Sequence, residues 1–90
     1  ILSMDDLANY TSIFDDPVAS TFEGYEILGH DTWTQAPMLQ QTLNILEHFD
    51  LRAMGHNSPE YIHTVSEALK LVFGDREACY PKNMPLSVVD

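Results

Sequence analysis

The chain has 90 residues, of which 44% are hydrophobic, and 14 acidic against four basic side chains give a formal net charge of −10. This length allows one domain at most, and the hydrophobic share is typical of a folded chain rather than a disordered one. The scarcity of Lys and Arg argues against nucleic acid and anionic membrane surfaces as partners. No apolar run approaches the roughly 20 residues that cross a bilayer.

The single cysteine, Cys79, excludes a disulfide within the chain, and we expect it to fill a half-buried position near a helix end. Ile1 stands where a complete chain would carry an initiator Met, and a helix cap follows almost at once. Both features predict a piece of a longer protein. The cellular compartment stays open.

The first predicted element is a short helix that ends near Tyr10. Ser3 caps it, and Asp6 three residues later completes the pattern of a capping box. We expect Leu7 and Tyr10 to face inward.

A β-hairpin is predicted next. Pro17 ends the preceding segment, residues 18–22 and 25–28 have the composition of strands, and Glu23-Gly24 suits a two-residue turn because Gly accepts a positive φ. An isolated hairpin is marginal in water, so we expect it to join a larger sheet or to cover the helices.

After a connector over residues 29–37, a helix is predicted over residues 38–49, with Pro37 tolerated at its first turn. It is apolar over much of its circumference, which predicts that it lies between two layers. The apolar positions are Met38, Leu39, Leu43, Ile45, Leu46 and Phe49. Gly55 is expected to end the short irregular segment that follows.

The last predicted helix begins at a cap in Asn57-Ser58, with Pro59 at its first position, and runs to about Tyr80. Gly74 within it is expected to allow a neighbouring element to approach closely. A tail over residues 85–90 follows. The predicted apolar face holds Tyr61, Ile62, Val65, Ala68, Leu69, Val72 and Phe73.

One pattern in this helix is compatible with a metal site. Glu60, His63 and Glu67 share a helix face, and carboxylate with imidazole can ligate a metal. No second such motif exists, and the alternative is a solvated stripe in which Glu67 pairs with Lys70 at i+3. We favour the stripe.

Other polar residues are expected to have structural roles. Asp75 and Arg76 near the helix end are expected to tie neighbouring segments together, with Arg76 available for a bidentate bond to a carboxylate. No nucleophile motif accompanies the remaining histidines or loop hydroxyls, and no Gly-rich phosphate loop is present. These positions are His30, His48, His56, Thr11, Ser12 and Thr32.

Several segments, in order and at similar spacing, resemble the γ-glutamyltransferase family. The segments are Asp6-Leu7-Ala8, Tyr10, residues 22–27, residues 43–51, residues 54–58, residues 61–63 and residues 67–76. The resemblance spans nearly the whole chain, 1–90, but only a small part of such an enzyme. It implies an N-terminal-nucleophile hydrolase with a four-layer αββα sandwich. In that family a precursor cleaves itself, and a freed N-terminal Thr attacks a γ-glutamyl amide.

By this resemblance the chain looks like the late middle of the large subunit. The Thr-Thr-His-type cleavage site is absent, so no catalytic, substrate-binding or metal residue is carried over, and no cofactor is implied. Residues 32–37 replace a Pro/Ser/Gly-rich run, and Pro81-Lys82-Asn83 replaces a Gly-Asp-Pro. These departures leave open hydrolase or transferase activity, and the acyl donor and acceptor.

The sequence therefore predicts an α+β segment, with a short helix, a hairpin and two longer helices. Its expected function is to serve as scaffold in a γ-glutamyltransferase-like enzyme, with the rest of the large subunit and the small subunit as partners. The chain alone is expected to be inactive and able to self-associate. The alternative is a binding or assembly module that presents the apolar face of residues 38–49. A metal protein using Glu60, His63 and Glu67 is a third, weaker reading.

Overall fold

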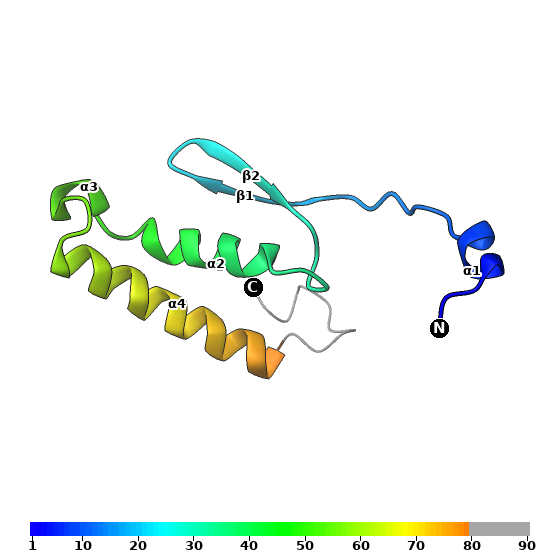
Figure 1. Cartoon of the computed structure of the whole chain (residues 1–90). Helices are drawn as coiled ribbons and strands as arrows, with labels where there is room; N and C mark the ends of the chain where they lie inside the picture. Colours follow the sequence, from blue (N-terminus) through cyan, green and yellow to red (C-terminus); the bar gives the residue numbers. More distant parts are fainter. Residues whose placement is uncertain (80–90) are drawn as a thin grey trace.

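The computed structural model describes residues 1–79. Helices and a hairpin are combined, which confirms the α+β class (Figure 1). The elements are α1 (Met4–Asn9), β1 (Val18–Phe22), β2 (Tyr25–Gly29), α2 (Ala36–Leu46), α3 (Leu51–Met54) and α4 (Pro59–Cys79). The predicted tail over residues 85–90 lies outside the described part. Within residues 1–79, no helix has the length and apolarity that crossing a membrane requires.

The hairpin forms as predicted, with β2 one residue longer. The strands are antiparallel, in a register that pairs Val18 with Gly29 and Phe22 with Tyr25. Glu23 and Gly24 both have positive φ, 47° and 84°, as two-residue hairpin turns require. The two strands form the whole sheet within the described residues.

Helix α2 lies between the hairpin and α4, as its wide apolar circumference predicted (Figure 1). On the hairpin side, the Gln40 side-chain Nε2 donates to the carbonyl oxygens of Val18, at 2.8 Å, and Ile27, at 3.1 Å. One buried amide therefore joins both strands to the helix. At the turn, the Glu23 backbone N–H donates to a Glu47 carboxylate oxygen at 3.2 Å.

The bounds and faces of this helix differ from the prediction. It begins two residues earlier, at Ala36, and ends at Leu46, because the next backbone N–H groups switch to i−3 carbonyls such as the bond from Phe49 to Leu46. Leu39, one of the apolar positions of the helix expected between two layers, is not covered: its side chain is 56% exposed, against 6% for Leu46. Leu39 and Leu46 are seven residues apart and share a helix face, so helical spacing alone does not separate them.

The segment predicted to be irregular contains the short helix α3. Asp50 caps it by accepting a hydrogen bond from the Ala53 backbone N–H at 3.1 Å. Gly55 ends it with a φ of 85°, as its predicted terminator role requires.

Helix α4 begins as predicted, with the Ser58 hydroxyl accepting from the Tyr61 backbone N–H at 3.1 Å. Ala68 and Val72, one turn apart, are its buried side chains and face α2. Leu69 was also placed on this face but is partly exposed, as are Ile62 and Phe73. The close approach predicted at Gly74 is not seen within residues 1–79, where no atom lies within 4 Å of the position that a Cβ would take there.

Residues 1–17, here called the N-terminal arm, extend away from the layered body (Figure 1). The capping box forms, with Ser3 and Asp6 exchanging hydrogen bonds. The inward placement of Leu7 and Tyr10 is wrong, because these side chains are 62% and 78% exposed and no described element packs on α1. The arm raises the radius of gyration to 17.2 Å, whereas a compact domain of this length has about 12 Å.

Candidate functional site

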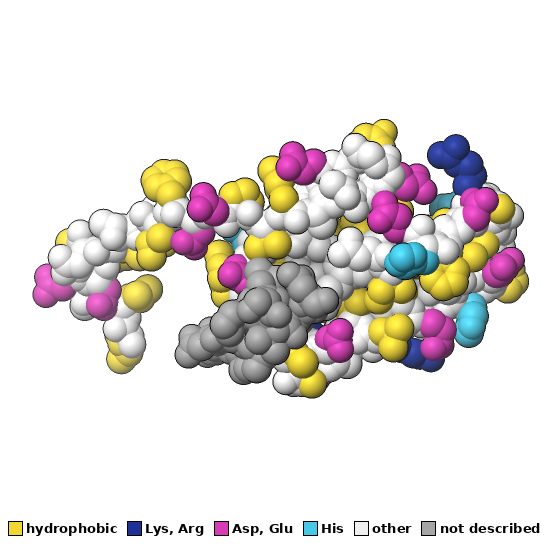
Figure 2. Space-filling view, turned by 180° about the vertical axis from the view of Figure 1, so that it is seen from behind, with side chains coloured by type: hydrophobic (Ala, Val, Ile, Leu, Met, Phe, Trp, Pro, Cys, Tyr) yellow, Lys and Arg dark blue, Asp and Glu magenta, His cyan; other side chains and the backbone are white. Residues whose placement is uncertain are grey.

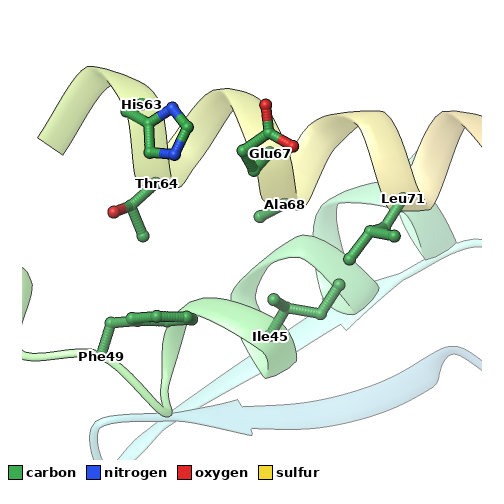
Figure 3. Close-up of a pocket in the computed structure, with 7 residues that line it drawn as sticks. All are labelled: Ile45, Phe49, His63, Thr64, Glu67, Ala68 and Leu71. Atoms are coloured by element: carbon green, nitrogen blue, oxygen red, sulfur yellow. The ribbon is translucent and has the colours of Figure 1, made fainter. Parts of the chain in front are cut away.

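An open pocket of about 200 Å³ lies between α2 and α4 (Figure 3). Helical spacing gathers the α4 side chains along one stripe, and Ile45 and Phe49 close the pocket from α2 and the turn after it. The lining residues are Ile45, Phe49, His63, Thr64, Glu67, Ala68 and Leu71.

The pocket wall is mainly apolar. Ile45 and Leu71 point toward one another across the gap between the helices, whereas the Glu67 carboxylate points away from α2 (Figure 3). An apolar side chain or a small apolar group fits such a wall. The polar side chains in the lining are His63, Thr64 and Glu67, all from α4.

The charged group at the pocket edge is already paired. The Lys70 ammonium donates to Glu67 Oε1 at 2.6 Å, which confirms the predicted i+3 pair. This hydrogen bond and the Lys70 charge, with a smaller contribution from His63, lower the pKa of Glu67 below its usual value. Glu67 is therefore an exposed carboxylate and not a proton donor near neutral pH.

The pattern of Glu60, His63 and Glu67, weighed as an alternative from the sequence, is not gathered into a cluster within the described residues. Among residues 1–79, no three His, Cys, Asp or Glu side chains gather in a geometry that could hold an ion. Glu60, His63 and Glu67 share a stripe of α4, but the pairing of Glu67 with Lys70 takes up the carboxylate.

Several hydroxyl groups serve local structure. Ser3 and Ser58 cap helices, Thr34 donates to the Asp31 carbonyl at 3.1 Å, and Thr42 donates to the Met38 carbonyl at 2.7 Å. The Ser3 hydroxyl also donates to the Asp6 carboxylate at 2.8 Å, as part of the capping box. Each of these four hydroxyls is therefore engaged in a cap or a local turn of the chain. Cys79 is a free, half-buried thiol, as expected.

The histidines are scattered, as the sequence suggested. The His30 ring lies 5.2 Å from that of Trp33, and the His56 ring lies 6.4 Å from that of Tyr61, centroid to centroid. His48 is exposed just after α2.

Arg76 makes contacts on its own helix. Its guanidinium lies 3.5 Å from the Glu77 carboxylate and 6.0 Å from the centroid of the Phe73 ring. The bidentate bond expected of Arg76 and the inter-segment role expected for Asp75 are not seen among the described contacts. Gln40 was not singled out from the sequence, because a single polar residue in an apolar helix has no distinguishing pattern.

Comparisons with known proteins agree on one family. The γ-glutamyltranspeptidase family model matches residues 1–87. The acylase ACY 1 proenzyme of Pseudomonas sp. (strain SE83) is 36% identical over 77 residues, which are 84% of this chain and 14% of that protein. The glutathione hydrolase-like YwrD proenzyme of Bacillus subtilis is also 36% identical over 77 residues, 86% of this chain and 15% of that protein.

A solved structure shows the same similarity in three dimensions. The crystal structure of Helicobacter pylori γ-glutamyltranspeptidase superposes with a TM-score of 0.78 at 31% identity, over 88% of this chain and 23% of that chain. The chain spans only 14–15% of the length of the two curated relatives. The match over residues 1–87 confirms the resemblance found in the sequence: the chain belongs to the γ-glutamyltranspeptidase family.

Proposed function

We propose that this chain is a scaffold segment of an N-terminal-nucleophile enzyme with an αββα sandwich. The observation that carries the proposal is the position of α2, covered by the hairpin on one side and by α4 on the other. This arrangement suits one sheet of a sandwich with helices on its outer face. The opposite face of the hairpin carries the cross-strand pair Ala19 and Leu28, both exposed, where a second sheet would pack.

The proposed chemistry is hydrolysis or transfer of γ-glutamyl or related acyl amides. The two curated relatives described above are named an acylase and a glutathione hydrolase-like protein, which supports an acyl amide substrate. Residues 32–37 depart from the family pattern, so hydrolysis and transfer stay as alternatives.

The catalytic nucleophile is proposed to lie outside this chain, in a small subunit released from the same precursor. Both curated relatives are named proenzymes, which supports such processing. The matched segment is a larger share of the crystallised chain, 23%, than of a proenzyme, 14%, which supports a place within one processed subunit. The partners are then the rest of the large subunit and the small subunit, and the 90-residue segment alone is inactive.

A helical binding module presenting residues 38–49 has less support. Met38 and Leu46 of that face are 6% exposed and already covered. The apolar part left open consists of Leu39, which is 56% exposed, and of Ile45 and Phe49 at the pocket.

The test is turnover of a γ-glutamyl anilide, and of a simple acyl anilide, by the full-length parent protein and by the 90-residue chain. We expect turnover by the parent and none by the chain. Leu46→Ala in the parent should reduce active protein, whereas Leu39→Ala, a matched change at an exposed position, should not. Turnover by the purified chain would contradict the scaffold role. A folded parent without amide turnover would contradict the proposed chemistry.

A further inference from the structure

The N-terminal arm exposes an unusual amount of apolar surface. No side chain of residues 1–17 is buried, and Phe14 is 100% exposed. The large apolar side chains are Ile1, Leu2, Met4, Leu7, Tyr10, Ile13 and Phe14. An aromatic side chain offers about 150–250 Å². With two aromatics and five aliphatics, the arm approaches the ~800 Å² per partner that a stable interface buries.

The arm lies within the part of the chain that the family model matches. The family match begins at residue 1 and therefore includes the whole arm. A capping box also preforms α1, and Pro17 restricts the chain just before β1, so less conformational entropy is lost when the arm docks. These features are typical of a segment with a defined place to bind.

The charges of the arm indicate what it binds. Its charged side chains are Asp5, Asp6, Asp15 and Asp16, with no Lys or Arg, and Figure 2 shows acidic and hydrophobic side chains along it. Residues 18–79 hold nine acidic and three basic side chains. Docking on a second copy would therefore bring like charges together, which opposes association.

We propose that the N-terminal arm docks on an apolar surface edged with Lys or Arg, located elsewhere in the same parent protein. This inference rests on the proposed function, because it requires a longer parent. The apolar side chains of the arm supply the buried area. Asp15 and Asp16, at the junction with β1, meet the basic edge and fix the register of the arm.

The test is hydrogen–deuterium exchange of residues 4–16 in the full-length parent, compared with the 90-residue chain. We expect exchange in the parent to be slower by at least about tenfold, at all protein concentrations. The double variant Asp15→Lys/Asp16→Lys should lose most of this protection. Asp15→Glu/Asp16→Glu should keep it. So should Glu60→Lys/Asp75→Lys, which changes the net charge equally on exposed positions of α4.

Three results would overturn the proposal. If residues 4–16 exchange equally fast in the parent and in the 90-residue chain, the arm is free. If protection appears only as protein concentration rises, the arm docks on a second copy. If protection stays complete after charge reversal at Asp15 and Asp16, the docking surface has no basic edge. Slow exchange in α2 and α4 shows that a variant is folded. If the Lys variant unfolds, the variant Asp15→Asn/Asp16→Asn replaces it, and exchange of residues 4–16 is measured in the same way. Anilide turnover separates the two proposals. Turnover with a free arm defeats only this one, and a protected arm without turnover defeats the proposed function.

Discussion

Gly29 and Ala36 lie so close together that a Cβ atom on Gly29 would stand 2.7 Å from the Cβ of Ala36. The end of β2 and the first residue of α2 meet at this point. A methyl group there would separate the hairpin from the helix beneath it.

Gly29→Ala should therefore destabilise the chain by about 1–3 kcal/mol through overpacking. Gly74→Ala is the matched control. No atom of the described residues would contact the new methyl group, and the change should stabilise by up to about 1 kcal/mol because Ala is the better helix former. Urea unfolding midpoints of the 90-residue chain measure both changes. Adding Ala36→Gly should recover part of the loss at residue 29. Midpoint shifts of the same sign for the two glycine variants would contradict the close approach.

Gln40→Ala should cost about 1–3 kcal/mol, because the carbonyls of Val18 and Ile27 would lose their shared donor in a buried place. Asn44→Ala, an exposed change on the same helix, should be nearly neutral. Unfolding midpoints and amide exchange of the hairpin are the measurements. Equal losses at residues 40 and 44 would mean that the amide does not join the strands to the helix.

Ser20→Ala provides the opposite case. Its buried hydroxyl has no hydrogen-bond partner among the described residues, so its removal should cost little or stabilise.

Leu46→Ala should cost about 2–5 kcal/mol, since it leaves a cavity between α2 and its neighbours. Leu39→Ala is the same chemical change on the same helix at a position that is 56% exposed, and it should cost well under half as much. Calorimetric or urea unfolding distinguishes them. Equal effects would require an additional layer over Leu39 in the isolated chain.

The stability of α1 should fall in acid. Hydrogen bonds from the Ser3 backbone N–H and then from its hydroxyl lower the pKa of Asp6 from its usual 3.8. The folded helix therefore binds the proton less well than the unfolded chain does. Its contribution is present above the usual pKa and is lost as pH falls through the lowered one. Carbon chemical shifts of residues 4–9 across an acid titration measure this loss. Asp6→Asn should abolish the pH dependence, and a retained transition in that variant would place its origin elsewhere.

The isolated chain should self-associate more strongly as salt rises. It exposes large apolar side chains on the arm, the hairpin and α2, but its −10 charge opposes contact between copies until salt screens it. Sedimentation at low and high salt, over a range of concentrations, is the measurement. A compact monomer under all conditions would mean that the segment is self-sufficient and that its exposed surfaces have no partner.

The local features of this protein were determined by its sequence alone. Ser3 and Ser58 cap their helices, Glu23-Gly24 makes the turn, and Glu67 pairs with Lys70, because each involves groups a few residues apart whose geometry the backbone sets. The family was also readable from short segments in order. The short helix α3 was missed because a four-residue helix has too few positions to show a period.

Burial and long-range contact were decided only by the tertiary structure. Leu39 and Leu46 share a face in the apolar pattern, yet the packing of the hairpin and α4 on α2 leaves Leu39 exposed and Leu46 buried. The two bonds of Gln40 and the fit of Gly29 against Ala36 depend on the same approach. Leu7 and Tyr10 are of residue types that often lie in a core, yet they are exposed because no element of residues 1–79 packs on α1. A side chain is buried only where a second layer meets it, and that meeting depends on groups far apart in the chain.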